Sequence, residues 1–464
     1  MPHLPVPEEL INIAKAVSSS AGNCILVGGA VRDYFLYQQV SKDLDVEVYG
    51  MSPENLEEVL SKFGAIHAVG KSFGVLKLKT ASAEYDFSLP RRENKTGKGH
   101  RGFIATADPD MNFQEAASRR DFTVNSIGYD LLTQTLLDPY DGIGDIKRKI
   151  LRHTGPAFSE DPLRVLRAMQ FSARLEFDIS ADTVLLCRKL DLTELSRERV
   201  FEEFCKLLLK SKQPSLGFNS AKILGILDYF PELKALLGVP QDPEWHPEGD
   251  VWVHTLLVLD EAAKLRKGEY RKDLELMLAA LCHDFGKPLT TEFLRGRWRS
   301  PAHDVEGVAP TVQFLLRLTN EQALIQQVTA LVKEHLRPVQ LYKDREKLKS
   351  GTIRRLALRV SIPEIVLLAT ADYLGRALTI EERAHFKPGE WLLLEAERIQ
   401  VRDEPPRPIL MGRHLLEMGL SPGPEIGAIL KQAFEIQLNG ELQTIDEALK
   451  WAKSYIAKLS HLAH

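Results

Sequence analysis

Apolar residues in the first 150 positions follow two alternating patterns. Short apolar runs bounded by turn residues predict strands at residues 24–27, 44–49, 65–69, 75–79 and 84–89. Segments 31–37 and 53–63 have helical spacing instead, and the second has Ser52 in position to cap it and Pro53 in its first turn. The alternation of strands and helices predicts an α/β domain over residues 1–150.

From about residue 158 onward, the pattern becomes almost entirely helical. Residues 162–175 and 197–210 have the spacing of amphipathic helices. The chain is therefore predicted to be α+β, with helices filling everything after the first domain. We expect three helical parts, at residues 151–225, 226–385 (core 251–375) and 386–464, the last of which contains a stiff Pro-rich linker at 403–408.

Composition places the chain among ordinary globular proteins, with 464 residues, 44% of them hydrophobic and 27% charged. The net charge of −4 provides no overall basic field, so a nucleic-acid surface has to come from local basic patches. Its four cysteines form no C-x-x-C pair, which favours reduced thiols and a cytoplasmic location. No run of 18 apolar residues or secretory leader is present, so we expect no membrane-spanning helix.

The first candidate site lies between residues 22 and 45. A predicted strand ends in Gly28-Gly29, where backbone N–H groups can approach phosphate oxygens at a helix N-terminus. The next strand carries Asp43 and Asp45, which strand alternation predicts to share one face. Either feature alone is usually a turn or a solvated surface pair. Together they predict a Mg²⁺-dependent nucleotidyl-transfer site.

Two further segments add basic and acidic side chains. Residues 91–114 are basic, rich in glycine and without periodicity, which predicts a mobile loop that contacts phosphates or is merely solvated. Arg119 and Arg120 suit a triphosphate, and Asp121 can accept hydrogen bonds from a ribose. A surface ion-pair cluster is the alternative for these three residues.

Residues 160–167 open a predicted helix with Asp161 and Arg164 on one face. A carboxylate beside a guanidinium presents acceptors and donors in one plane, as the edge of a nucleic-acid base requires. Arg167 lies one turn further and can reach a phosphate. The alternative is a capping carboxylate that forms an ion pair with Arg164.

Taken together, residues 22–177 resemble the class II tRNA nucleotidyltransferases, the CCA-adding enzymes of the polymerase β-like superfamily. The motifs that carry this resemblance are the segments 28–33, 43–45, 119–126 and 160–167. The resemblance implies that Asp43 and Asp45 hold catalytic Mg²⁺ and that Asp161 and Arg164 act as a protein template for CTP or ATP. It also implies nucleotide contacts by a larger set: Gly28, Gly29, Arg32, Arg120, Asp121 and Arg167.

A second constellation lies between residues 251 and 375. Imidazoles and carboxylates spread over several helices can converge on one or two divalent metals and activate a water molecule. This block resembles an HD-type metal phosphohydrolase domain, whose defining ligands match His254, His283, Asp284 and Asp372. His303 and His335 would complete a second metal position. In the branch with this domain, the resemblance implies phosphatase and cyclic phosphodiesterase activity.

The resemblance implies a polymerase β-like nucleotidyltransferase head at 1–150, an all-α neck, an all-α HD domain and a helical tail. The implied partners are the acceptor region of tRNA, CTP and ATP, with no membrane, and the sequence leaves the oligomeric state open. Candidate tRNA contacts are Lys343, Arg345, Lys347, Lys349, Arg354 and Arg355.

Three alternatives remain at this stage. Bacterial poly(A) polymerases share the head motifs but carry a basic patch after the third strand, where this chain has Gly70-Lys71-Ser72-Phe73-Gly74. Addition restricted to A or to CC keeps the tRNA substrate, and the full-length loop at 91–114 argues only against CC. Finally, the head could bind tRNA without catalysis while the HD domain acts as a hydrolase.

Overall fold

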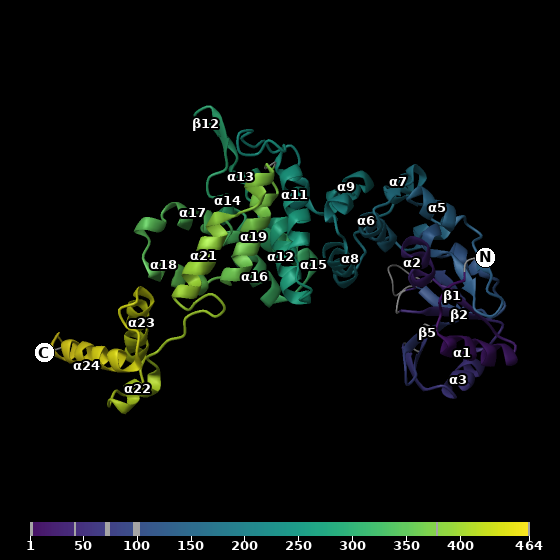
Figure 1. Cartoon of the computed structure of the whole chain (residues 1–464), viewed down its shortest axis with the longest axis horizontal. Coiled ribbons are helices and arrows are strands. Elements are labelled where there is room, and N and C mark those ends of the chain that lie inside the picture. Colours follow the sequence, from purple (N-terminus) through teal and green to yellow (C-terminus); the bar gives the residue numbers. More distant parts are fainter. Residues whose placement is uncertain (1–2, 41–42, 70–74, 96–102, 377–378, 463–464) are drawn as a thin grey trace. The chain divides into compact units, whose positions relative to one another are not determined.

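The protein is described by a computed structural model covering residues 3–40, 43–69, 75–95, 103–376 and 379–462 (Figure 1). The chain forms two compact units, Met1–Tyr229 and Phe230–His464. Two sequence predictions, the departure from the poly(A) polymerase patch at 70–74 and the glycine-rich centre of the basic loop at 96–102, lie outside the described residues.

A seven-stranded sheet forms the centre of the first unit, with the strand order β3-β4-β5-β2-β1-β8-β9. Strands β2 and β5 run parallel, and the other neighbours in the sheet are antiparallel. Its strands are β1 (Asn23–Val27), β2 (Asp45–Tyr49), β3 (Ala65–Val69), β4 (Val75–Lys79), β5 (Glu84–Ser88), β8 (Gly128–Asp130) and β9 (Leu136–Leu137). All five predicted strands are therefore present.

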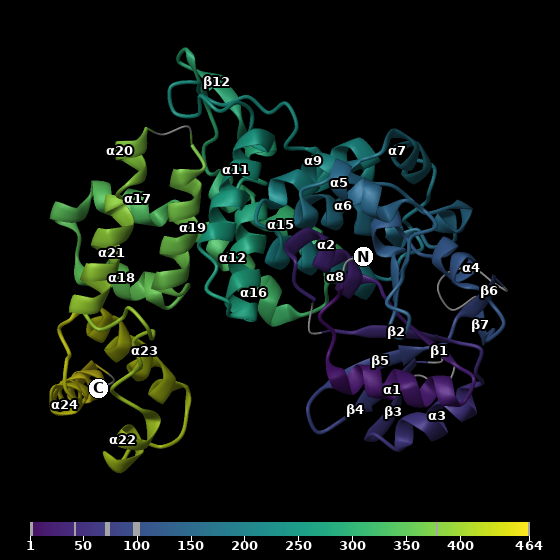
Figure 2. The ribbon, with the colours of Figure 1, turned by 45° about the vertical axis from the view of Figure 1, so that its right-hand side comes forward.

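Two helices cover this sheet, α3 (Pro53–Ser61) where the sequence predicts one and α1 (Glu8–Ser19) where it predicts none. Helix α1 packs against β1, and α3 packs against α1, β3 and β4 (Figure 2). The side chain of Ser52 accepts a hydrogen bond from the backbone N–H of Asn55, so it is the N-cap of α3 as predicted.

Strand β2 begins one residue later than predicted, at Asp45. Its partner β1 ends at Val27, opposite Asp45, because the chain turns at Gly28 (φ 74°) into α2 (Gly29–Tyr37). Asp43 therefore lies ahead of the paired residues. The strand alternation that predicted a shared face for Asp43 and Asp45 does not extend to Asp43.

The basic segment 91–114 is not a loop throughout, which corrects the sequence prediction. Strands β6 (Arg91–Lys95) and β7 (Phe103–Ala107) pair antiparallel, and α4 (Phe113–Ser118) begins within the predicted loop, capped by Asn112. Strand β7 contains the β-branched residues Ile104 and Thr106, which favour a strand. The basic and glycine-rich composition of the whole segment led to the prediction of a loop.

A group of helices follows the sheet in the same unit. Its largest member, α6, is buried along most of its length and packs against α8 and α9, as the amphipathic pattern at 162–175 predicted. The helices are α5 (Gly142–Arg148), α6 (Leu163–Leu175), α7 (Ala181–Cys187), α8 (Arg197–Lys210) and α9 (Pro214–Leu224), with β10 (Ile150–Leu151) and β11 (Asp178–Ile179) paired beside them.

The second unit is a bundle of helices with one short hairpin, β12 (Glu292–Leu294) and β13 (Arg297–Arg299). Helices α11, α12, α16 and α19 pack against one another and form its core. The helices are α10 (Pro231–Lys234), α11 (Val251–Lys264), α12 (Tyr270–Cys282), α13 (Lys287–Thr290), α14 (His303–Glu306), α15 (Val308–Leu318), α16 (Gln322–Glu334), α17 (Arg337–Lys343), α18 (Ser350–Ala357), α19 (Ile362–Leu374), α20 (Ile380–Arg383) and α21 (Lys387–Arg398).

The end of the chain has a small apolar cluster of its own, to which Leu415, Ile429 and Ala452 belong. Its helices are α22 (Gly412–Glu417), α23 (Pro424–Asn439) and α24 (Ile445–Leu462). Among all described helices, none combines the length and the apolar character needed to cross a membrane. The predicted α+β architecture, a mixed-sheet head followed by helices, is confirmed.

Two of the basic residues predicted to contact tRNA also contact a neighbouring helix. Arg354 of α18 donates to the carbonyl oxygen of Leu438 (3.1 Å), and Arg355 forms an ion pair with Glu435 (2.8 Å). Both guanidinium groups thus hold α23 against α18.

Candidate active sites

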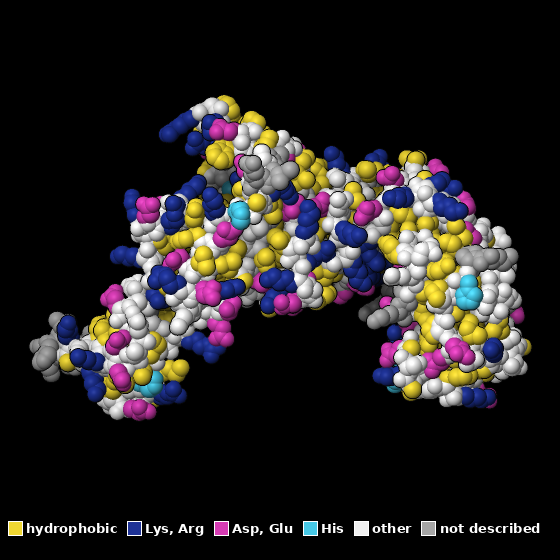
Figure 3. All heavy atoms as spheres, viewed as in Figure 1, with side chains coloured by type: hydrophobic (Ala, Val, Ile, Leu, Met, Phe, Trp, Pro, Cys, Tyr) yellow, Lys and Arg dark blue, Asp and Glu magenta, His cyan; other side chains and the backbone are white. Residues whose placement is uncertain are grey.

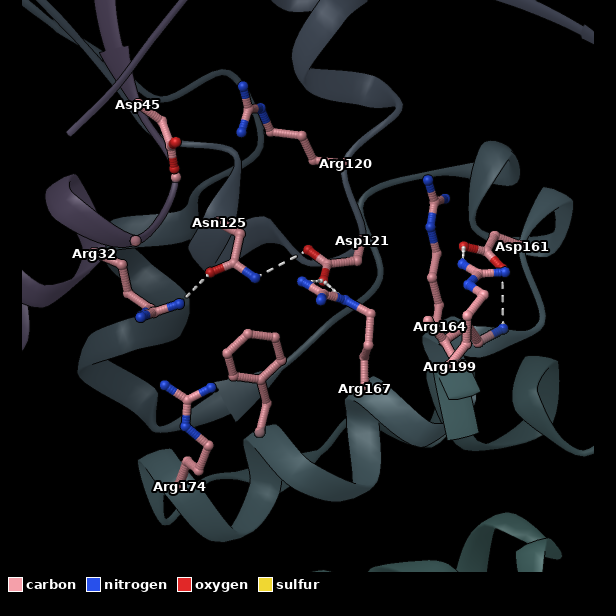
Figure 4. Close-up of a pocket in the computed structure, with 14 residues that line it drawn as sticks. Arg32, Asp45, Arg120, Asp121, Asn125, Asp161, Arg164, Arg167, Arg174 and Arg199 are labelled. Atoms are coloured by element: carbon pink, nitrogen blue, oxygen red, sulfur yellow. Dashed lines mark hydrogen bonds and ion pairs between the residues drawn. The ribbon is translucent and has the colours of Figure 1, made fainter. Parts of the chain in front are cut away.

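A cavity of about 490 Å³ opens in the first unit (Figure 4). Six arginines and three aspartates line it, an excess of positive charge that suits a polyanionic ligand. The lining residues are Gly28, Gly29, Arg32, Asp45, Arg120, Asp121, Asn125, Asp161, Leu163, Arg164, Arg167, Phe171, Arg174 and Arg199. Of the site residues predicted in this unit, Asp43 and Arg119 are missing from that lining, and Arg119 forms an ion pair with Glu160 (2.9 Å).

The two glycines bring backbone close to charged side chains. Gly28 has φ 74°, which favours glycine, and a Cβ there would lie 3.6 Å from Oδ2 of Asp45 and 3.7 Å from Nη1 of Arg120. A Cβ on Gly29 would lie 3.6 Å from Nη2 of Arg32. The turn therefore leaves an open approach to the N-terminus of α2, where an anion is favoured.

Carboxylates gather at the start of β2. Burial, the charge of Asp86 and the charge of Asp43 raise the pKa of Asp45, while Arg120 and Lys77 oppose them. Asp86 is opposite Asp45 in the parallel β2–β5 pair. Nζ of Lys77 lies 3.2 Å from Oδ2 of Asp86. Mutually repelling carboxylates fit a divalent cation, since oxygen ligands and negative charge are what Mg²⁺ prefers.

A chain of hydrogen bonds crosses the cavity from α2 to α6. Arg32 donates to Oδ1 of Asn125 (2.7 Å), and Nδ2 of Asn125 donates to Oδ1 of Asp121 (2.9 Å). Arg167 then donates to Oδ2 of Asp121 (2.7 Å). Burial opposes the charge on Asp121, but Arg167 and these hydrogen bonds outweigh it and hold the pKa of Asp121 below its ordinary value.

Asp121 also has a role within the protein. Both of its carboxylate oxygens accept hydrogen bonds, through which Asp121 orients Arg167 and Asn125. The contact with a ribose that the sequence suggested stays a prediction. Asn125, which connects Arg32 to Asp121, was not singled out from the sequence.

Asp161 and Arg164 are held by different partners and not by each other. Arg199 of α8 lies 2.7 Å from Oδ2 of Asp161, and Oδ1 accepts from the backbone N–H of Leu163 (3.1 Å). Arg164 donates to the carbonyl oxygens of Ala157 and Arg119, both at 2.6 Å. The simple i, i+3 ion pair considered from the sequence is absent from these contacts, and both side chains are fixed in place beside the cavity (Figure 4).

Phe171 contacts three of the six arginines that line the cavity. The guanidinium carbons of Arg32, Arg167 and Arg174 lie 5.3, 5.2 and 5.3 Å from the centre of its ring. Burial and the charge of Arg32 lower the pKa of Arg174. Arg174 and Arg199 were not predicted from the sequence. The spacing of Arg167, Phe171 and Arg174 along one face of α6 could have predicted Arg174, whereas Arg199 comes from a different helix.

The second unit brings together its predicted ligands from α11, α14, α19 and the ends of α12 and α16. Nε2 of His254 lies 3.1 Å from Oδ1 of Asp372 and 3.8 Å from Oδ2 of Asp284. Among the described residues, three groups of side chains place their ligand atoms within 4.8 Å of one another: His254, His283 and Asp372; Asp284, His303 and His335; and His246, Glu248 and His254. The six predicted residues all lie in the first two groups. The resemblance, however, placed Asp284 with His254, His283 and Asp372, whereas the geometry groups it with His303 and His335.

The imidazoles in this second cluster are oriented for metal binding. Nδ1 of His283, His303 and His335 each lies within 2.8 Å of a backbone carbonyl oxygen, so each Nδ1 donates and each Nε2 keeps its lone pair. Burial, together with His303 and His283, lowers the pKa of His335 to about 4, which keeps its ring neutral near pH 7.

Buried polar atoms without a hydrogen bond at the centre of the cluster also fit a metal. Nε2 of His283 and both carboxylate oxygens of Asp284 form none among the described residues, although Nε2 of His283 lies 3.2 Å and Nζ of Lys287 2.7 Å from Oδ2 of Asp284. His283 and Lys287 outweigh the effect of burial and hold the pKa of Asp284 well below its ordinary value. Lys287 is one cationic partner of this buried carboxylate, and a divalent metal would be another.

Glu248 and His246 join this cluster, although the sequence analysis did not name them. Oε1 of Glu248 lies 2.8 Å from Nδ1 of His254 and 2.8 Å from Nδ1 of His246. Glu248 is buried, so both imidazoles share one oxygen of a dehydrated carboxylate. A carboxylate on Nδ1 fixes the tautomer that leaves Nε2 of His254 free for a metal.

Comparison with known proteins adds to this geometry. Residues 24–152 match the poly A polymerase head domain, residues 176–237 match a probable RNA- and SrmB-binding site of polymerase A, and residues 251–377 match the HD domain. A multifunctional CCA protein of Xylella fastidiosa is 40% identical over 368 residues, covering 76% of this chain and 83% of the relative. One from Stenotrophomonas maltophilia is 38% identical, covering 88% of this chain and 97% of the relative.

Solved structures share the fold. A Bacillus stearothermophilus CCA-adding enzyme in complex with CTP has a TM-score of 0.65 and 19% identity, covering 98% of both chains. A Thermotoga maritima CCA-adding enzyme complexed with tRNA has a TM-score of 0.57 and 18% identity, covering 97% of this chain and 96% of that one. With close relatives along most of its length and with a head and an HD domain in the same order, this chain belongs to the family of the multifunctional CCA proteins.

Proposed function

We propose that this protein adds CCA to the 3′ end of tRNA from CTP and ATP without a nucleic-acid template, and that its HD domain is a metal-dependent phosphohydrolase. The observation that carries the first activity is the cavity in which a Gly-Gly turn, clustered carboxylates and six arginines meet. The names of the relatives support the same conclusion.

The proposed reaction is in-line attack of the tRNA 3′-hydroxyl on the α-phosphate, with pyrophosphate as leaving group. Asp43 and Asp45 would hold Mg²⁺, which would supply activation of the hydroxyl and charge stabilisation of the leaving group. Arg32, Arg120 and Arg167 bind the triphosphate tail near the N-terminus of α2. Because Asn125 and Asp121 fix Arg32 and Arg167 beforehand, little reorganisation is needed when the nucleotide binds.

The choice of base follows from Asp161 and Arg164. Cytosine and adenine each present an amino donor beside a ring-nitrogen acceptor, whereas uracil and guanine present an oxygen acceptor beside an N–H donor. A carboxylate accepts from the amino group and a guanidinium donates to the ring nitrogen, so this pair matches only the first two bases. Arg199 supports the assignment, since its ion pair holds the Asp161 carboxylate in place.

For the HD domain we propose hydrolysis of phosphoesters, including cyclic ones, with a bound divalent metal whose identity is open. His254, His283, Asp284 and Asp372 would hold the metal, with His303 and His335 at a second position. Such metals supply an activated water molecule. The buried atoms of His283 and Asp284 that form no hydrogen bond among the described residues support this proposal.

A tRNA transcript that lacks CCA tests the proposed transferase. With Mg²⁺, CTP and ATP, we expect its intact mass to increase by two cytidylates and one adenylate. Two cytidylates alone would indicate CC addition, and extension only of a transcript that already ends in CC would indicate A addition. A long run of adenylates would favour a poly(A) polymerase. No extension of any transcript would leave the HD domain as the working enzyme.

A further inference from the structure

The β12–β13 hairpin carries an unusual combination of exposed aromatic and basic side chains. Phe293 is 59% exposed and Trp298 37% exposed, yet both belong to regular strands. Their rings pack edge to face with centroids 5.1 Å apart. Figure 3 shows hydrophobic and basic side chains together at the end of this hairpin. Large exposed aromatics that no neighbouring element covers are typical of a binding surface.

The register separates the two faces of the hairpin. Phe293 is opposite Trp298, whereas Leu294 is opposite Arg297, so the aromatic pair and Arg297 lie on opposite faces. Arg297 forms an ion pair with Glu244 (2.5 Å), which ties its face to the segment before α11. The face that carries Phe293 and Trp298 is therefore the one available to a ligand.

One arginine is placed to accompany the aromatic pair. Arg295 and Gly296 form the two-residue turn, both with positive φ (51° and 79°), a conformation in which asparagine or glycine would be less strained than arginine. Arg299 is opposite Glu292 and shares the face of Arg297, away from the aromatic pair. Within the described part of the chain, Arg295 forms no ion pair, so its charge is available to phosphates.

The hairpin emerges directly from the HD site. At its base, Oγ1 of Thr291 lies 2.8 Å from Oγ of Ser300, and the carbonyl oxygen of Ser300 accepts from Nδ1 of His303 (2.8 Å). On the other side, Glu244 is followed by Trp245, which is 57% exposed, and His246, which contacts Glu248 in the metal cluster. Aromatic and basic groups therefore border the phosphohydrolase site on two chain segments.

We propose that Phe293 and Trp298 form a stacking platform for the last nucleotides of an RNA, with Arg295 on its backbone, so that its terminal phosphate reaches the HD site. Aromatic rings alternating with arginines are the chemistry that binds single-stranded nucleic acid without sequence preference. A surface for another protein would not require arginine at a strained turn. This inference rests on the proposed phosphohydrolase function of the same domain.

The test compares two substrates in the full-length protein. For the Phe293→Ala/Trp298→Ala variant, we expect KM to rise at least about tenfold for hydrolysis of a short RNA with a terminal cyclic phosphate. Hydrolysis of a cyclic mononucleotide, which is too small to reach the platform, should stay within about twofold. Trp298→Phe should restore RNA binding, and Tyr270→Ala, an exposed aromatic at the start of α12, should match the wild type.

A second measurement does not depend on hydrolysis. RNA that carries 5-iodouridine near its 3′ end should crosslink on irradiation to the peptides containing Phe293 or Trp298. If the wild type hydrolyses neither substrate, the proposed phosphohydrolase function is wrong. The crosslinks alone then test whether Phe293 and Trp298 bind RNA. Unchanged KM together with crosslinks elsewhere would overturn the inference. So would unchanged KM with a loss of self-association in gel filtration, since the hairpin would then be a contact between copies of the chain.

Discussion

At the scale of single residues, both sites use side chains whose neighbours fix them before any ligand binds. In the head, Asp121 and Asn125 orient Arg167 and Arg32, so both guanidinium groups are already in place before a phosphate binds. In the HD domain, backbone carbonyls or Glu248 hold the Nδ1 side of each imidazole. Preorganised groups of this kind lose little free energy in rearrangement when they act.

Arg174 provides a prediction at this scale. It donates to Gln170 (3.1 Å) and forms no ion pair with the described residues, so its charge is the least compensated among the cations around Phe171. We expect Arg174→Ala to raise KM about tenfold for CTP and for ATP alike, because the triphosphate is common to both. Steady-state kinetics measure this, with Arg188→Ala, a residue bound to the carbonyl oxygen of Ile223, as control. An effect on one nucleotide only would contradict a triphosphate contact.

Glu248 provides a second prediction at the scale of single residues. Glu248→Gln keeps the size of the side chain but removes the charge that holds Nδ1–H of His254, so metal affinity of the HD site should fall about 10- to 100-fold. Calorimetric metal titration of the full chain measures it, and Glu244→Gln in the same segment is the matched control. Unchanged affinity would mean that the hydrogen bond to His254 is only structural.

At the scale of elements, the sequence predicts regular periodicity well and long-range contacts poorly. The strands from β1 to β5 and helix α6 follow from patterns within a few residues. Strands β6 and β7 were missed, because seven residues of basic, glycine-rich sequence separate them and pairing depends on the partner strand. The same reason explains why Glu248 and Arg199 were missed, since each acts on a residue of another element.

The close approach of α13 to α14 permits a test at the element scale. A Cβ on Gly286 would lie 2.0 Å from the carbonyl oxygen of His303. At this distance the two atoms overlap, so the backbone would have to move. We expect Gly286→Ala to displace His303, to cost about 1–3 kcal/mol of stability, and to weaken metal binding. Thermal unfolding and metal titration measure both effects. Gly427→Ala, at a position with nothing within 4 Å of the added Cβ, should leave metal binding unchanged and unfold as the wild type does.

At the scale of the whole molecule, the two units carry separate chemistry. The carboxylate cluster of the nucleotide cavity lies entirely within Met1–Tyr229, and the metal cluster lies entirely within Phe230–His464. The fold class, the order of the head and the HD domain, and most residues that line the cavity or form the His/Asp cluster were predictable from motifs. The partners that orient them were not, because no local pattern records which distant side chain completes a hydrogen bond.

This separation predicts independent loss of the two activities. Asp45→Asn should reduce nucleotide addition by at least about a thousandfold while leaving phosphoester hydrolysis intact, and Asp284→Asn should do the reverse. Extension of a tRNA transcript and hydrolysis of a cyclic mononucleotide are the two assays. A variant that loses both activities while remaining folded would contradict the assignment of one reaction to each unit.

The central claim is that protein side chains choose the base, and competition between nucleotides tests it most directly. With a transcript lacking CCA and all four nucleoside triphosphates present, mass analysis should show only C and A added by the wild type. Asp161→Ala should lower kcat/KM for CTP and ATP, and it should reduce discrimination against UTP and GTP about 10- to 100-fold, since each such bidentate contact contributes about 1–3 kcal/mol. Discrimination equal to that of the wild type in Asp161→Ala and Arg164→Ala would contradict the account.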